Sequence, residues 1–182
     1  MKVISGKYKG KKLLCYDLNG TRPTMDRVKE SVFASIQDYI KDSIVLDLYS
    51  GSGNLAIEAL SNYANKAYLV DKSKDAIKVI NSNIKDLKIT NAYVIKGDAI
   101  NKLNDFIKEN KVFDIIFLDP PYNTNEIDKV LSIINKNINI LSKEGLIVCE
   151  TTLNIDYDKY NNLYVYKNKK YGQKYVNILK TK

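Results

Sequence analysis

The sequence predicts an α/β fold in which a mostly parallel sheet of seven strands is covered by helices on both faces. Short apolar segments alternate along the chain with longer amphipathic ones, a pattern that favours right-handed crossovers between parallel strands. Near the C-terminus two alternating segments flank a turn containing Gly172, which is typical of an antiparallel hairpin. The length of 182 residues and a hydrophobic fraction of 45% suit one domain, which we expect to span residues 1–182.

Each element has its own signal. Short apolar, β-branched runs predict strands at 44–48, 67–71, 92–96, 113–118 and 146–150, with the closing hairpin at 162–167 and 174–180. Helices are expected at 22–40, 54–63, 74–87, 100–109 and 126–138; in 74–87 the apolar residues lie three or four apart, and Pro23 stands at the start of 22–40. Residues 3–14 are expected to form a small basic hairpin that turns near 6–10. We therefore divide the chain into an N-terminal extension, 1–20, and a core, 21–182.

Several residue types are absent or sparse, which excludes whole classes of site. The chain has no histidine, which removes Ser-His-Asp and Cys-His catalysis and histidine-ligated metals. Cys15 and Cys149 match no zinc or redox spacing and are expected to be small, partly buried side chains. No apolar run is long enough to span a membrane, and the N-terminus lacks the pattern of a signal peptide. We expect a cytoplasmic monomer without a metal.

The net charge of +8 is unevenly distributed. Residues 1–30 carry a net charge of +5 and residues 159–182 a net charge of +7, whereas residues 31–158 carry −4. Basic ends around an acidic body are typical of a surface that binds a polyanion. The alternative is a general bias toward lysine, with these side chains simply covering a solvated face.

A glycine-containing turn follows the first predicted strand. Asp47-Leu48-Tyr49-Ser50-Gly51-Ser52-Gly53 runs from that strand into a helix, and its glycines allow a ligand to approach the backbone. Asp71 ends the next strand, where its carboxylate can hold both hydroxyls of a ribose. The turn alone also fits an ordinary strand–helix connection, but together these residues favour an adenosine-type ligand at the carboxyl ends of the strands. The cofactor candidates are Asp47, Tyr49, Ser50, Gly51, Gly53, Asp71, Lys72, Asp98 and Ala99.

Asp98 and Ala99 belong to this set because Gly97-Asp98-Ala99 ends the third strand in the same way. The Asp98 carboxylate can accept a hydrogen bond from an adenine amine, and Ala99 can offer its backbone N–H. Asp98 is equally suited to cap the following helix, and the two roles are compatible.

The most informative motif is Asp119-Pro120-Pro121-Tyr122, directly after the fourth strand. Two consecutive prolines stiffen the backbone and remove two N–H donors, so the loop presents acceptors. The Asp119 carboxylate and the Pro120 carbonyl can hold both N–H bonds of a base amino group and stabilise the charge that develops on its nitrogen during methyl transfer. Tyr122 can stack on the base. The alternative, an ordinary proline turn, explains neither its position nor its use of two of the three prolines.

Basic residues near the N-terminus form the candidate substrate-binding set. Arg22 and Arg27 can hold phosphates, or can pair with Asp26 and Glu30 on one helix face. The predicted N-terminal hairpin adds basic side chains suited to a phosphate backbone, Lys7, Lys9, Lys11 and Lys12.

These motifs together resemble a known family. The segments 4–13, 21–30, 46–53, 117–122 and 170–172 are similar, in order and over essentially the whole chain, to the RsmD-like family of bacterial 16S ribosomal RNA guanine-N2 methyltransferases. The resemblance implies a class I S-adenosylmethionine-dependent methyltransferase fold, which is Rossmann-like, and S-adenosylmethionine as cofactor. It also implies a guanine of 16S rRNA as substrate, within a small-subunit particle. The family commonly has Glu where this chain has Asp71, so the side chain that would hold the ribose is shorter here.

Three other functions remain open. A DNA adenine-N6 methyltransferase uses the same proline loop, but this chain lacks a target-recognition insertion of the expected size. A nicotinamide-dependent oxidoreductase accounts for the glycine turn and leaves the proline loop unexplained. A non-catalytic RNA-binding assembly factor predicts RNA binding without methyl transfer.

Overall fold

The computed structural model describes residues 1–15, 23–121, 125–152 and 155–182. Their helices and strands follow one another as η1 (Gly6–Tyr8), α1 (Pro23–Ile40), β1 (Ile44–Asp47), α2 (Asn54–Ser61), β2 (Lys66–Asp71), α3 (Lys74–Asp86), β3 (Ala92–Lys96), α4 (Ala99–Lys108), β4 (Phe113–Leu118), α5 (Glu126–Lys136), η2 (Ile138–Ile140), β5 (Leu141–Thr151), β6 (Leu163–Tyr171) and β7 (Lys174–Thr181). The predicted order of strands and helices is confirmed.

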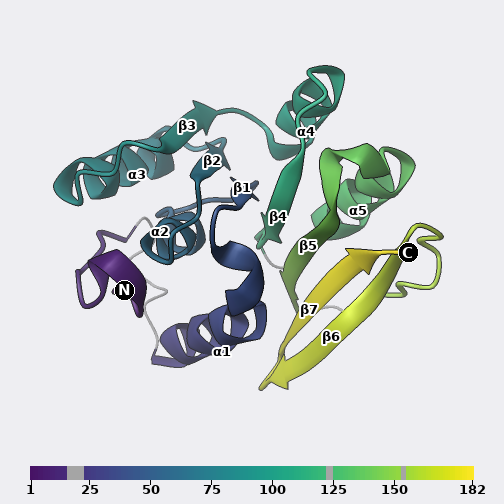
Figure 1. Cartoon of the computed structure of the whole chain (residues 1–182), viewed down its shortest axis with the longest axis horizontal. Coiled ribbons are helices and arrows are strands. Elements are labelled where there is room, and N and C mark those ends of the chain that lie inside the picture. Colours follow the sequence, from purple (N-terminus) through teal and green to yellow (C-terminus); the bar gives the residue numbers. More distant parts are fainter. Residues whose placement is uncertain (16–22, 122–124, 153–154) are drawn as a thin grey trace.

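A seven-stranded sheet runs through the middle of the molecule in the order β3-β2-β1-β4-β5-β7-β6 (Figure 1). Strands β1 to β5 pair in parallel, and β7 pairs antiparallel with both β5 and β6. The strand order reverses at β1, which has β2 on one side and β4 on the other. In open α/β sheets this reversal creates a crevice at the carboxyl ends of the strands, where ligands bind.

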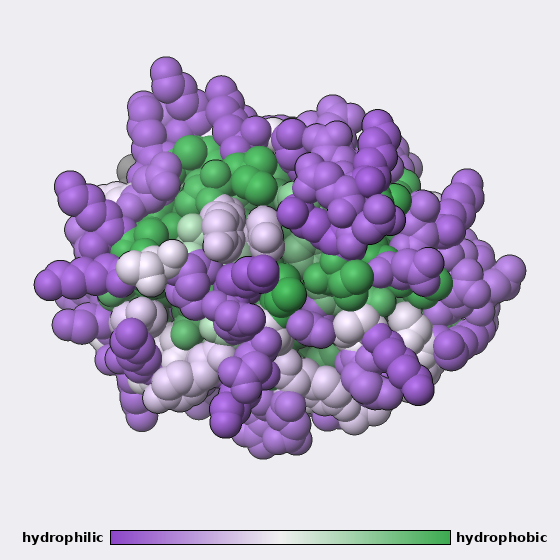
Figure 2. All heavy atoms as spheres, turned by 45° about the horizontal axis from the view of Figure 1, so that its top comes forward, coloured by the Kyte–Doolittle hydropathy of each residue, from purple (hydrophilic) through white to green (hydrophobic). Residues whose placement is uncertain are grey.

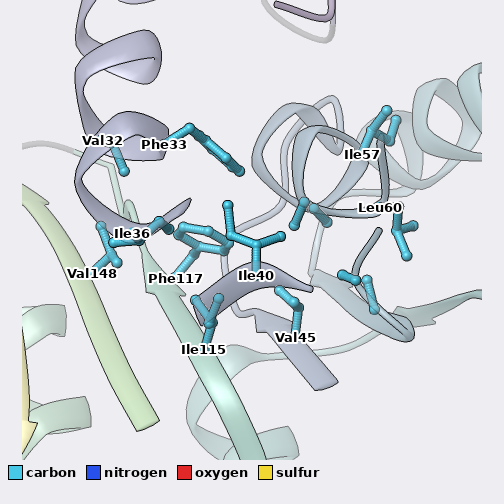
Figure 3. Close-up of a cluster of buried hydrophobic side chains, with 14 of the residues drawn as sticks. Val32, Phe33, Ile36, Ile40, Val45, Ile57, Leu60, Ile115, Phe117 and Val148 are labelled. Carbon is cyan, nitrogen blue, oxygen red and sulfur yellow. The ribbon is translucent and has the colours of Figure 1, made fainter. Parts of the chain in front are cut away.

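Apolar clusters cover both faces of the sheet. On one face α1, α2 and α3 pack against alternate residues of the strands, and α1 contributes Phe33, whose ring stacks on Phe117 of β4 at 5.8 Å between centroids. Figure 3 shows the side chains of α1 directed at β4 and β5. On the other face α4 and α5 bury Leu103, Phe106 and Leu131. The parallel strands are buried on both sides, as their continuous apolar sequences predict.

Two strands are longer than predicted. β5 begins at Leu141 rather than at 146, and its pairing with β4 shifts register between Phe113 and Ile115. β6 continues to Tyr171 rather than ending at 167. The added stretches are polar because they lie at the start of a strand and on an edge strand, where few side chains face the core.

The N-terminal segment folds back on itself, but with less regular structure than the predicted hairpin. Its two arms meet in a single antiparallel bridge between Lys2 and Lys12, and the short helix η1 forms the turn. The turn packs against the C-terminal end of α2, where Tyr8 N–H donates to Ser61 Oγ at 2.9 Å. A Cβ on Gly6 would meet the Ser61 carbonyl oxygen at 1.9 Å, so only glycine allows this close approach.

A buried ion pair fixes this segment to the core. Lys29 Nζ lies 2.7 Å from Glu58 Oε2, and both side chains are almost fully buried. Glu58 also accepts hydrogen bonds from the backbone N–H groups of Ile4 and Ser5, and Lys29 donates to the carbonyl of Lys2. The pair therefore connects α1, α2 and the N-terminal arm.

Replacing Lys29 with methionine is expected to lower the free energy of unfolding by about 3–5 kcal/mol, because it leaves the Glu58 charge buried without its cation. Urea denaturation measures the change. Lys78→Met removes an exposed i,i+3 pair with Asp75 and should cost less than about 1 kcal/mol. Equal losses in the two variants would contradict a structural role for the buried pair.

The face of the molecule drawn in Figure 2 is largely hydrophilic. Figure 2 shows one face on which polar side chains project around a band of apolar ones. No helix in the part of the chain that the structure describes has both the length and the apolar character to cross a membrane. Within the same ranges, no three His, Cys, Asp or Glu side chains gather as metal ligands would. Cys149 is buried, Cys15 is half-buried, and both are free thiols.

Candidate active site

The turn between β1 and α2 forms the floor of the candidate cofactor site. Ser50 Oγ donates to the Asp47 carbonyl at 2.8 Å, and Gly53 N–H donates to the Ser50 carbonyl at 2.6 Å. Gly51 and Gly53 both have positive φ, 54° and 78°. A Cβ on Gly53 would lie 3.1 Å from the Leu69 side chain, so glycine here lets α2 begin close against β2. Among the described residues other than its two chain neighbours, none has an atom within 4 Å of a Cβ built on Gly51, so this side of the turn is open to a ligand.

Asp47 lies buried beneath this turn, and its carboxylate is poorly satisfied. Among the described residues, its Oδ1 is buried without a hydrogen-bond partner. Burial raises the pKa of Asp47 to about 7. Hydrogen bonds from the backbone of Tyr49 and Ala56 act in the opposite direction and lower it, but burial has the larger effect. A buried acceptor without a donor costs free energy, which a bound cation or N–H group would recover.

Asp71 ends β2 beside the same turn. Its Oδ2 accepts from Gly51 N–H and its Oδ1 from Ser73 N–H, both at 2.8 Å. A carboxylate has about four acceptor positions, so these two bonds orient Asp71 and leave positions for ribose hydroxyls. Lys72 follows it and is exposed.

Asp98 caps α4 at the end of the neighbouring strand β3. Its Oδ1 accepts from Asn101 N–H at 3.0 Å, which is the capping role that the sequence allows. Asp98 is exposed and Ala99, the first residue of α4, is buried. Gly97 N–H donates to the Asp71 carbonyl at 3.0 Å, so the ends of β2 and β3 are joined directly.

The proline loop leaves β4 at the same edge of the sheet. Asp119 is half-buried, Pro120 is buried and Pro121 is exposed, so the loop passes from the core to the surface. Burial raises the pKa of Asp119 to about 8; the nearby Glu150 adds to the increase and Lys174 opposes it. Since Asp47 also raises the Asp119 pKa, the two carboxylates are close enough to interact. Tyr122 lies outside the described residues.

A hydrogen bond links the cofactor turn to the element that follows the proline loop. Tyr49 Oη donates to Glu126 Oε2, at 2.9 Å, in the first turn of α5. Burial, together with this bond, raises the pKa of Tyr49. Tyr49 is therefore held across the site as a neutral hydroxyl.

The predicted substrate-binding residues that the structure describes belong to the N-terminal segment and to the start of α1, not to the strand ends. Arg27 is exposed near the start of α1, and Arg22 lies outside the described residues. Lys7, Lys9, Lys11 and Lys12 are all exposed. The turn that carries Lys7 packs at the far end of α2 from Gly53, about 12 Å away for a helix of this length. A polyanion that touched this turn would have to extend well beyond the cofactor turn.

Two charged residues beside Asp119 were missed by the sequence analysis. Glu150 near the end of β5 and Lys174 at the start of β7 form an ion pair, with 20% and 24% of their side chains exposed. No motif marks them, and only the pairing of β5 with β7 brings them together.

Comparison with known proteins places the chain in a family. Residues 1–180 match the family model described as conserved hypothetical protein 95. Ribosomal RNA small subunit methyltransferase D of Buchnera aphidicola subsp. Baizongia pistaciae is 38% identical over 173 residues, covering 93% of this chain and 86% of that protein. The Escherichia coli K12 protein of the same name is 33% identical over 151 residues, covering 83% of this chain and 74% of that protein.

The fold is shared as well. The solved structure of Escherichia coli yhhF, described as a candidate methyltransferase, aligns with a TM-score of 0.86 at 29% identity and covers 100% of this chain and 98% of that one. The seven-stranded sheet with its antiparallel C-terminal strands is the class I methyltransferase arrangement that the sequence predicted. With the whole-length sequence matches, this shows that the chain belongs to the RsmD family of ribosomal RNA methyltransferases.

Proposed function

We propose that the protein transfers a methyl group from S-adenosylmethionine to the exocyclic N2 amine of a guanine in 16S rRNA, presented in a small-subunit particle. The observation that carries the proposal is the position of Asp119-Pro120 at the end of β4, beside Asp47 and the turn after β1. Family membership supports an RNA substrate, because relatives named ribosomal RNA small subunit methyltransferase D match most of the chain.

The residues at the turn fit this cofactor. Asp47 Oδ1, buried without a partner among the described residues, suits an ammonium group. Asp71 suits the ribose hydroxyls, and Asp98 with the Ala99 N–H suits the adenine edge. The rest of the cofactor surface would be lined by the other predicted cofactor residues, Tyr49, Ser50, Gly51, Gly53 and Lys72. The cofactor supplies a methyl group on a positively charged sulfur, and the bonding electron pair stays on that sulfur after transfer.

The proline loop would orient the amine. The Asp119 carboxylate and the Pro120 carbonyl would accept hydrogen bonds from the two N–H groups of the amine. These contacts favour a tetrahedral nitrogen, whose lone pair forms the new N–C bond. Pro121 keeps the loop rigid, and Tyr122 would stack on the base. A base within a helix must leave its stack to reach this position. The chain has no histidine to act as an imidazole base, and we expect the amine proton to pass to solvent.

Methylation assays with labelled S-adenosylmethionine test the proposal. Small-subunit particles from cells lacking this gene should accept label, and nucleoside analysis should find it in N2-methylguanosine. Label only in adenine of duplex DNA would instead support the DNA methyltransferase alternative. RNA binding without any label would support a non-catalytic assembly factor.

Phosphate binding by the N-terminal segment is tested by charge removal. Replacing Lys9, Lys11 and Lys12 together with glutamine should weaken RNA binding and lower the slope of log K against log salt by about 0.7–0.9 for each phosphate that the variant no longer neutralises. Filter binding over a salt series measures the slope. Replacing Lys108, Lys136 and Lys143, which are also exposed, removes the same charge elsewhere and should leave the slope nearly unchanged. Equal effects of the two triple variants would mean that the segment acts through net charge alone.

A further inference from the structure

Three charged side chains on neighbouring strands stand in a row at the edge of the sheet that carries the proline loop. Asp119 follows β4, Glu150 lies near the end of β5, and Lys174 begins β7, the next strand in the sheet. We propose that Glu150 and Lys174, together with Asp119, read the Watson–Crick edge of the target base and make the site selective for guanine. The inference rests on the proposed function and names the residues that determine its base specificity.

The strand register puts Asp119 and Glu150 side by side. Leu118 pairs with Cys149, and the next residue along each parallel strand is Asp119 and Glu150. Leu118 and Cys149 belong to the core under α4 and α5. Because side chains alternate along a strand, Asp119 and Glu150 both point to the opposite face, the one covered by α1.

Lys174 lies on that same face. Val176 pairs with Glu150 across β5 and β7 and packs in the core beneath α1. Lys174 is two residues from Val176, so its side chain shares this face and reaches Glu150 diagonally. The ion pair between Lys174 and Glu150 confirms the contact. Asp119 experiences both charges: Glu150 raises its pKa and Lys174 lowers it.

The order of these groups matches guanine. Along its Watson–Crick edge guanine presents the O6 acceptor, the N1–H donor and the N2 amine donor in succession. Lys174, Glu150 and Asp119 offer a donor, an acceptor and an acceptor in the same succession. Their backbones are spaced by about 4.8 Å per strand, and the ion pair draws the Lys174 side chain toward Glu150 in the middle of the row, so the row can converge on one base edge.

Adenine does not fit this row. Beside its amine it presents N1 as an acceptor, so the Glu150 carboxylate would face a lone pair rather than a hydrogen. A site whose buried polar groups are left unpaired rejects the wrong substrate strongly. The Lys174 charge also offsets the repulsion between the two carboxylates. The row therefore favours guanine over adenine by charge and hydrogen-bond pattern.

A base analogue isolates the contribution of this edge. 2-Aminopurine keeps the amine that accepts the methyl group but lacks both O6 and the N1 hydrogen. It is placed by ligation in 16S rRNA at the nucleotide that mapping identifies, and the RNA is reconstituted into small-subunit particles. For the unaltered protein we expect kcat/KM on 2-aminopurine to be about 100-fold lower than on guanine.

Glu150→Gln should change this ratio. The glutamine amide can donate to N1 of 2-aminopurine, so the preference for guanine should fall at least about tenfold, with kcat/KM on guanine itself reduced about 100-fold. Calorimetry with S-adenosylmethionine and thermal unfolding should show little change. Glu144→Gln is the matched control, since Glu144 is also on β5 and pairs with a β7 lysine, Lys180, near the opposite end of β5. The Glu144→Gln protein should keep the original ratio of kcat/KM on guanine to kcat/KM on 2-aminopurine.

Lys174→Met gives a second, independent variant. It removes the donor to O6, a contact that 2-aminopurine never makes, so the ratio should again fall at least about tenfold; the accompanying loss of the ion pair with Glu150 affects both bases and leaves the ratio to report on O6. If a folded Glu150→Gln or Lys174→Met protein kept the unaltered preference for guanine, the proposal that these side chains read the base would be overturned. The proposed methyl transfer to guanine would be unaffected by that result. If the unaltered protein placed no methyl group on guanine, the proposed function and the row would both be overturned.

Discussion

Replacing Asp119 with alanine is expected to lower kcat for methyl transfer by about 1,000-fold while leaving the affinity for S-adenosylmethionine nearly intact. The carboxylate is one of two acceptors that would hold the amine, and removing one preorganised electrostatic contact typically costs about 100- to 1,000-fold. The Asp119 backbone before Pro120 and the turn after β1 are unaltered by the change. Single-turnover kinetics and calorimetry measure the two quantities separately.

Two comparisons make this result specific. Asp105→Ala removes a partly exposed carboxylate of α4 that pairs with Lys102, and it should leave both quantities unchanged. Activity should also depend on pH, because the Asp119 pKa of about 8 keeps the carboxyl partly protonated near neutrality. In the free enzyme kcat/KM should therefore reach half of its plateau value at about pH 8 and level only above that pH. An alanine variant with most of its activity would refute the role assigned to Asp119.

Replacing Asp47 with asparagine is expected to weaken S-adenosylmethionine binding by about 10- to 100-fold and to stabilise the free protein at alkaline pH. The binding loss follows from removing a charged acceptor that would meet the cofactor ammonium. The stability gain follows from the pKa of about 7, raised from the ordinary aspartate value of 3.8. The folded protein holds that proton more tightly than the unfolded chain, so this contribution is present at low pH and is lost as pH rises through about 7.

Thermal unfolding of the cofactor-free proteins at pH 5 and pH 9 measures the second effect. The difference in Tm between unaltered protein and Asp47→Asn should favour the variant more strongly at pH 9. Asp75→Asn, at an exposed aspartate of α3, should show the same Tm difference at both values. A variant that binds S-adenosylmethionine as tightly as the unaltered protein would contradict the placement of Asp47 at the cofactor.

The sequence predicts the order and type of the main elements because apolar periodicity reports directly on burial. It is less informative where a strand is not enclosed. Leu141, at the start of β5, pairs with Phe113 ahead of a polar stretch, and the polar residues 168–171 of β6 pair with β7; these backbone pairings are not revealed by side-chain patterns. The N-terminal arm is likewise held by Glu58 and Lys29 rather than by regular strand pairing.

The candidate site shows the same limit. Asp47, Asp71 and Asp119 can be found from the sequence because each directly follows or ends a buried strand, and parallel strands bring those ends together. Glu150 and Lys174 carry no local motif, and their relation to Asp119 depends on strand register and on the antiparallel direction of β7. The distance of the Lys7 turn from Gly53 also required the structure, because it depends on where that turn packs along α2.

Mass mapping of small-subunit rRNA from cells with and without this gene tests the central proposal most directly. We predict one guanosine that carries an N2 methyl group in the presence of the gene and none in its absence, with methylation restored by the unaltered protein and not by Asp119→Ala. Identical 16S rRNA from the two strains, or a methyl group lost from adenine in DNA instead, would contradict it.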